Sequence, residues 1–251
     1  MVSPKYPSFD AHAHIATDVT AAQVRGLKNA IVFAMTRSLS EATSVPHGCY
    51  GNIVWGIGVH PRDSDALDLY VGDRFEAMLR KFALVGEVGL DRRSGRIERQ
   101  KEVFGDILVR AATSSVMVSI HSTAATEDVI EILRKHPVKA PILHWFGGSP
   151  KQILEATELG AWFSVNASMK DEVITAIPRN RLLTETDFPY TRRAGATRPG
   201  SIDSIIEKLA LLWETTADEV QQEVWSNLLR LVEVAGVRSR LPYELQAQLG
   251  P

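Results

Sequence analysis

Several histidines and acidic residues of this sequence stand at the ends of short apolar runs. Asp10, His12 and His14 close the first run, in the segment Phe9–His14. Alternation along an extended strand places these three side chains on one face. Imidazole and carboxylate groups are common protein ligands of zinc, manganese, iron, nickel and magnesium. A lone His-x-His pair is also common without a metal, so the case rests on what accompanies it.

The later runs carry further groups of the same kind at matching positions. They are His60 after the third run, Glu87 and Asp91 at the end of the fourth, His121 after the fifth, His144 after the sixth and Asp187 after the eighth. In a barrel these ends converge on one rim, where such enzymes keep their active sites. The resulting ligand set is larger than one tetrahedral ion needs. We therefore expect two ions joined by a bridging carboxylate, ~3.5–4 Å apart, an arrangement suited to phosphoryl displacement. His47 and His136 lie elsewhere, and we expect them at the surface.

Eight apolar runs must position these residues. They are Tyr6–Ala11, Asn29–Ala34, Asn52–Val59, Ala83–Val88, Val116–Ile120, Ala140–Leu143, Ala161–Val165 and Arg181–Thr184. Their length and content of valine and isoleucine are typical of buried parallel strands. Helical periodicity between the runs predicts helices over Leu67–Lys81, Ile97–Ala112, Glu127–Lys135 and Lys151–Leu159. Ser149–Gln152 and Thr216–Glu219 are typical of capping boxes, and the second opens a helix that reaches about Val234.

Strand–helix alternation repeated about eight times indicates a parallel sheet, closed or open. The length of 251 residues is about that of one barrel, which typically has ~250. We therefore expect an α/β fold: a single (β/α)8 TIM barrel over residues 1–251, with the metal site at the C-terminal ends of the strands.

Charge and composition limit the partners. The net charge of −2 gives no overall attraction to a polyanion, so binding DNA needs a local basic patch. Candidate arginines follow two ligand-bearing runs: Arg92, Arg93, Arg96 and Arg99 after the fourth, and Arg192, Arg193 and Arg198 after the eighth. They suit phosphate binding or, equally, solvated surface positions. The aromatic residues Trp145, Phe146, Phe188 and Tyr190 either stack on bases or cover the barrel mouth.

The remaining composition favours a cytoplasmic protein without membrane association. Cys49 is the only cysteine, which excludes an intramolecular disulfide and suits a reducing compartment. No run reaches the ~20 apolar residues of a spanning helix, and the start of the chain does not resemble a signal peptide.

The sequence resembles the TatD-type metal-dependent deoxyribonucleases of the amidohydrolase superfamily. The resemblance is carried by Phe9–His14, Gly58–Pro61, Gly86–Asp91, His121, Leu143–Gly148 and Leu183–Tyr190, in matching order and approximate spacing from Phe9 to about Leu231. It implies a (β/α)8 barrel that hydrolyses phosphodiester bonds in DNA, with two divalent ions (Zn, Mg or Mn) and metal-activated water.

The resemblance also implies roles for individual residues. Six side chains would bind the ions: His12, His14 and Asp187 at the first ion, His121 and His144 at the second, and Glu87 between them. Glu87 and Asp187 would be catalytic, Asp187 by orienting the attacking water or accepting its proton. His60 would lie near the scissile phosphate. We assign substrate binding to His60, Arg92, Arg93, Trp145, Tyr190 and Arg192.

Departures from the family pattern concern the rim and leave substrate choice open. Arg92, Arg93 and Trp145 stand where many relatives have other residues, and Ser164–Asn166 differs at the end of the seventh run. One alternative is a small-molecule hydrolase acting on an ester, amide or lactone. Another is an accessory subunit with partner proteins in a DNA repair or defence assembly. Lost ligands would mark such a subunit, and no ligand position is lost here.

Overall fold

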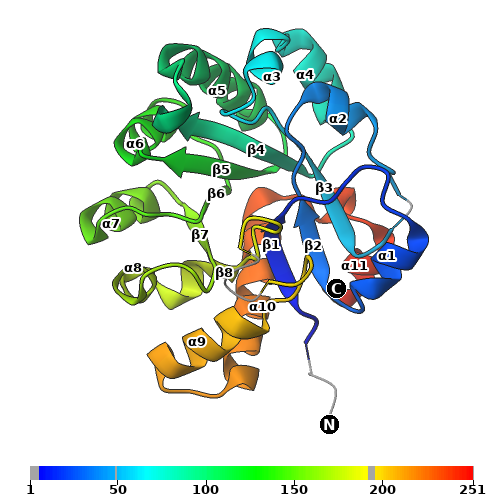
Figure 1. Ribbon diagram of the computed structural model, residues 1–251, viewed down its shortest axis with the longest axis vertical. Helices are drawn as coiled ribbons and strands as arrows, with labels where there is room; N and C mark the ends of the chain where they lie inside the picture. The colour runs from blue at the N-terminus through cyan, green and yellow to red at the C-terminus, as the bar shows by residue number, and fades with distance from the viewer. Residues whose placement is uncertain (1–5, 49, 192–195, 251) are drawn as a thin grey trace.

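Eight parallel strands form the wall of a barrel in the computed structural model, which describes residues 6–48, 50–191 and 196–250. Sheet neighbours follow chain order from β1 to β8, and every neighbouring pair is parallel (Figure 1). The strands are β1 Phe9–Ala13, β2 Ile31–Ala34, β3 Ile53–Ile57, β4 Leu84–Asp91, β5 Met117–Thr123, β6 Pro141–His144, β7 Trp162–Val165 and β8 Leu182–Thr184. The expected (β/α)8 architecture is confirmed.

Helices follow the strands and cover the outside of the barrel (Figure 1). They are α1 Ala21–Gly26, α2 Leu39–Thr43, α3 Ser64–Asp68, α4 Gly72–Leu79, α5 Ile97–Ala112, α6 Thr126–Lys135, α7 Pro150–Glu158, α8 Asp171–Ala176, α9 Asp203–Trp213, α10 Ala217–Ala235 and α11 Tyr243–Gln248, with short 3-10 turns η1 Arg92–Ser94, η2 Arg179–Arg181 and η4 Arg238–Arg240. Both predicted capping boxes are confirmed, at the starts of α7 and α10. In the described part of the chain, no helix has the length and apolar character to cross a membrane.

The single helix predicted over Leu67–Lys81 is wrong, because the chain forms α3 and α4 there with a break between them. Asp63 begins α3 one turn earlier by accepting a hydrogen bond from the backbone N of Ala66 at 2.9 Å. Within the break, the hydroxyl of Tyr70 donates to Asp106 of α5 at 2.6 Å. This contact with another helix is invisible to local periodicity.

The seam between the first and last strands is closed by Asp10. Its carboxylate accepts hydrogen bonds from the backbone N of Thr186 at 2.8 Å, the hydroxyl of Thr186 at 2.6 Å and the backbone N of Gly200 at 2.7 Å. Next to it, the backbone N of Asp187 donates to the carbonyl of His12 at 2.8 Å. Asp10 therefore holds the end of β8 against β1, and this seam lies beside the predicted ligands.

Candidate metal centre

The buried carboxylate of Glu87 lies at the centre of five imidazole rings. Glu87 is in the middle of β4 and is 2% exposed. The distances from its oxygens to the nearest imidazole nitrogen are 2.6 Å for His121, 2.9 Å for His144, 3.1 Å for His60, 3.2 Å for His14 and 3.5 Å for His12. Oε1 faces the imidazoles from β5 and β6, and Oε2 faces the others. Each oxygen of the carboxylate therefore faces a different set of imidazole nitrogens.

Two glycines let the neighbouring backbone approach Glu87 this closely. A Cβ atom at Gly58 would lie 1.9 Å from the carbonyl oxygen of Thr36 and 2.5 Å from the backbone N of Glu87. Gly89 has a φ of +130°, and a Cβ there would lie 2.2 Å from the carbonyl oxygen of His121. Only glycine fits such contacts without moving the backbone. Glycine at position 58, two residues before His60, and at position 89, two residues after Glu87, is thus required by the site.

Asp187 faces the first strand from the other side of the cluster. Its Oδ1 is 3.9 Å from Nε2 of both His12 and His14. The residue has a φ of +44°, which is uncommon for a residue with a side chain. Burial raises the pKa of Asp187 to about 8, and the negative charge of Glu185 acts in the same direction, against the charge of His144.

Charges within the cluster shift the pKa values of its members in opposite directions. Burial by itself would raise the pKa of Glu87, but the charges of His60 and His144 hold it well below its usual range. Burial would lower the pKa of His144, but Glu87 and Glu185 raise it well above its usual range. Burial and the charge of His144 lower the pKa of His12. Without metal, the raised pKa of His144 and the lowered pKa of Glu87 both favour a pair of opposite charges.

The residues present fit a pair of divalent ions. Ligand atoms within 4.8 Å of one another form three overlapping groups: His12, His14 and Asp187; His12, Glu87 and His144; and His60, Glu87 and His121. Nε2 of His12 is buried and has no hydrogen-bond partner among the described residues. Its Nδ1 lies 2.8 Å from the hydroxyl of Ser119, so Nε2 is the atom turned toward the carboxylates. A buried nitrogen left without a partner is unfavourable, and a cation would satisfy it. The donors suit Zn or Mn, and the carboxylates also suit Mg.

His60 was predicted to lie near the scissile phosphate. In the structure it belongs to the cluster and directly contacts Glu87. Its Nδ1 accepts a hydrogen bond from the backbone N of Arg62 at 3.0 Å. Nε2 is therefore the ring nitrogen that donates, and it lies 3.1 Å from Oε2 of Glu87. In this tautomer His60 is a hydrogen-bond donor at the centre of the site.

The other residues predicted to bind substrate differ in their exposure and in whether they already form ion pairs. Trp145 and Tyr190 are 37% and 56% exposed, and the Tyr190 ring stands edge-on to His14 at 5.8 Å between centroids. The guanidinium of Arg92 is paired with Asp128, and its Nε donates to the carbonyl of Ala124 at 3.2 Å. The side chain of Arg93 is exposed. It forms no ion pair with any residue that the structure describes. Arg192 and Arg193 lie outside the described residues, as does Cys49.

Two buried polar residues at the site were missed from the sequence. Ser119 of β5 contacts His12, and Glu185, 1% exposed, lies behind His144. Glu185 directly follows the apolar β8, and a charged residue in that position is a signal that could have been used. Ser119 gives no such signal, because its partner comes from a distant strand.

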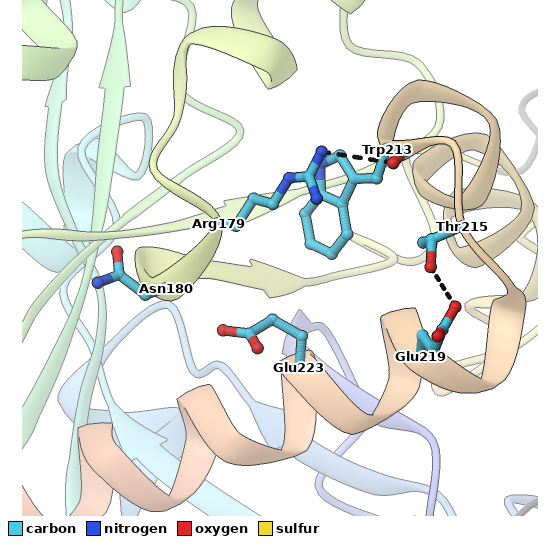
Figure 2. Close-up of a pocket in the computed structure, with 6 residues that line it drawn as sticks. All are labelled: Arg179, Asn180, Trp213, Thr215, Glu219 and Glu223. Carbon is cyan, nitrogen blue, oxygen red and sulfur yellow. Dashed lines mark hydrogen bonds between the residues drawn. The ribbon is translucent and has the colours of Figure 1, made fainter.

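A surface hollow of about 460 Å³ lies away from this centre (Figure 2). It is lined by Arg179, Asn180, Trp213, Thr215, Glu219 and Glu223. Arg179 is in η2, which precedes β8, so the hollow is toward the opposite end of the barrel from the ligands. Two of its polar side chains are already engaged: Arg179 lies over the Trp213 ring at 5.0 Å, and Glu219 accepts from Thr215. We assign the chemistry to the cluster around Glu87.

Comparison with known proteins agrees with this architecture and with metal-dependent hydrolase relatives. A Bacillus subtilis protein named uncharacterized metal-dependent hydrolase YabD is 28% identical over 90% of this chain and 99% of its own length. The Klebsiella pneumoniae protein named 3'-5' ssDNA/RNA exonuclease TatD is 28% identical over 71% of this chain and 72% of its own. The crystal structure of YJJV, a TatD homolog from Escherichia coli, shares the fold, with a TM-score of 0.74 at 22% identity over 89% of this chain and 96% of that one. The family model described as TatD related DNase matches residues 9–233, and the chain belongs to that family.

Proposed function

We propose that this protein is a metal-dependent hydrolase that cleaves phosphodiester bonds in DNA, with single strands as the preferred form. The observation that carries the proposal is the placement of Glu87, whose two oxygens face two different sets of imidazole nitrogens. Such a carboxylate is suited to joining two cations. The names of the Bacillus and Klebsiella relatives support metal-dependent hydrolysis and a single-stranded nucleic acid substrate respectively.

The side chains around the cluster divide the work of hydrolysis. Bound divalent ions would lower the pKa of water and stabilise the charge that develops on the phosphoryl oxygens. Glu87 would fix the separation of the two ion positions. Asp187, a buried carboxylate that faces His12 and His14, would orient the attacking water and accept its proton. His60, whose Nε2 hydrogen faces Glu87 in the metal-free chain, would donate that hydrogen to a phosphate oxygen of the substrate once Glu87 holds the ions.

The rim offers contacts for one strand. Trp145 and Tyr190 are exposed aromatic rings on which bases can stack. Arg93, which has no ion-pair partner among the described residues, would bind a phosphate. The exposed Arg37 and Arg62 flank His60, whose backbone N donates to the carbonyl of Arg37 at 2.8 Å, although Nε of Arg62 also lies 3.7 Å from Oδ2 of Asp91. These contacts supply the local positive charge that the net charge of −2 does not.

A small ester, amide or lactone is the competing substrate class, and one observation favours it. Arg92 and Arg96, two of the predicted phosphate-binding arginines, are already paired with Asp128 and Asp68. The mouth therefore has fewer free cations than the sequence suggested.

The test is a cleavage assay beside metal analysis. The purified protein is incubated with Mg, Mn or Zn and with labelled single- and double-stranded DNA, together with ester, amide and lactone substrates, and Glu87→Ala is the control. We expect metal-dependent cleavage of DNA, fastest on single strands, and none with Glu87→Ala. Bound metal without cleavage of any DNA would overturn the proposal, and turnover of an ester or lactone alone would favour the competing class.

A further inference from the structure

We propose that Glu185 and Asp91 are positioning residues for the second ion, a role that rests on the proposed two-ion site. Each carboxylate lies behind one imidazole, Glu185 behind His144 and Asp91 behind His121. Each would hold a proton on the far nitrogen of its ring, so that the near nitrogen offers its lone pair to the cation. The imidazoles of the first ion have no such support among the described residues.

The contact between Glu185 and His144 is fully buried. Oε2 of Glu185 is 3.7 Å from Nδ1 of His144, a buried nitrogen without a hydrogen-bond partner in the described residues. The other nitrogen, Nε2, is 2.9 Å from Oε1 of Glu87. Ser164 and Asn166 of the neighbouring segment donate to the two oxygens of Glu185, at 2.5 and 2.9 Å. Two donors thus hold the carboxylate behind the ring, and a hydrogen bond to Nδ1 would require the 3.7 Å separation to shorten.

Asp91 repeats the arrangement at the end of β4. Its Oδ2 is 3.3 Å from Nε2 of His121, while Nδ1 of that ring is 2.6 Å from Oε1 of Glu87. Asp91 is 3% exposed, and its Oδ1 accepts from the backbone N of Arg93 at 2.9 Å. Both imidazoles that face Oε1 of Glu87 are therefore supported from behind by a carboxylate.

The two imidazoles of β1 differ. His12 has the neutral hydroxyl of Ser119 at Nδ1, and Nδ1 of His14 is buried without a hydrogen-bond partner in the described chain. A carboxylate behind a metal-bound imidazole fixes its tautomer and raises its basicity, and its loss lowers metal affinity by about 10–100-fold. Loss of Glu185 should therefore weaken one of the two ions and leave the other unchanged.

The experiment is a zinc titration of the purified chain against a competing chelator, without nucleic acid. Wild type should bind two ions, and Glu185→Gln should bind one of them about 10–100-fold more weakly. Ser164→Ala should weaken the same ion by a smaller factor, because Glu185 loses one of its two donors. The matched control is Glu172→Gln on α8, where the glutamate is exposed. Far-UV circular dichroism in chelator checks that each variant folds.

A double-mutant cycle tests whether Glu185 acts through His144. Adding Glu185→Gln to His144→Ala should change zinc affinity no further, whereas adding it to His12→Ala should weaken both ions. An equal effect in both backgrounds overturns the proposal, since it indicates a general structural role. So does a Glu185→Gln variant that binds both ions as wild type does. A wild-type chain that binds no divalent ion would overturn both the proposed function and this inference. A wild-type chain that binds two ions, with Glu185→Gln unchanged, would overturn this inference alone.

Discussion

Replacing Glu87 with glutamine removes a charge from the centre of the imidazole cluster while keeping the side-chain volume. In the metal-free protein the carboxylate faces His144, whose pKa it raises well above the usual value. Both groups are buried, at 2% and 4% exposure. Removing one partner of a buried ion pair costs about 3–5 kcal/mol. We therefore expect the free energy of unfolding of metal-free Glu87→Gln to be ~3–5 kcal/mol below that of wild type at about pH 6.

The same reasoning fixes the sign of the pH dependence. A histidine whose folded-state pKa is raised adds stability that is fully present below its unfolded value of 6.5. That stability is lost as pH rises through the raised pKa, because the proton leaves the folded state as well. The difference between wild type and Glu87→Gln should therefore be largest in mildly acidic solution and should shrink in alkaline solution.

Urea denaturation in the presence of a chelator, followed by circular dichroism, measures this difference. Glu172→Gln is again the control, because it removes an exposed carboxylate. Metal analysis of the reloaded proteins should show two ions in wild type and at most one in Glu87→Gln. A loss of less than ~1 kcal/mol at about pH 6, with an unchanged dependence on urea, would refute the buried charge pair.

Three further predictions concern the backbone, the rim and the protons of the site. Gly58→Ala should lower the free energy of unfolding by at least ~1–3 kcal/mol, because the added methyl would lie 1.9 Å from a backbone carbonyl oxygen. Thermal unfolding measures this loss, and the metal content should fall with it. Unchanged stability would contradict so close an approach of the two backbone segments. Arg93→Ala should reduce the slope of log affinity for single-stranded DNA against log salt concentration by ~0.7. Arg96→Ala should leave this slope unchanged, because Arg96 is already paired with Asp68. Equal slopes for wild type and Arg93→Ala would show that Arg93 does not contact the DNA. Zinc affinity should fall as pH is lowered, because protons compete for His144; a pH-independent affinity in chelator competition would exclude this ring as a ligand.

The ends of the strands could be predicted from the sequence because each apolar run stops at a group with obvious chemistry. We expected His12, Glu87, His144 and Asp187 on one rim. In the structure His12 and His144 both face Glu87, and Asp187 faces His12. Period and residue type suffice for this, since parallel strands in a barrel place their C-terminal ends on the same side. The bounds of α5, Ile97–Ala112, were also predicted from its periodicity.

What the sequence could not predict depends on contacts between distant segments. Alternation placed Asp10 on the face of the histidines, but its partners Thr186 and Gly200 follow the last strand. The pairing of Arg92 with Asp128 likewise depends on how α6 packs beside η1. Such pairings decide which charges stay free at the mouth, and no local pattern encodes them.

The seam between β1 and β8 has a consequence for how the molecule holds together. His12 and His14 stand on one side of it and Asp187 on the other, so a cation shared by these three residues would cross-link the beginning of the barrel to its end. A ligand that binds only the closed form stabilises it by mass action. A cation bound by His12, His14 and Asp187 would therefore stabilise the contact between β1 and the end of β8. Amide hydrogen exchange in the first and last strands should slow together when this cation binds.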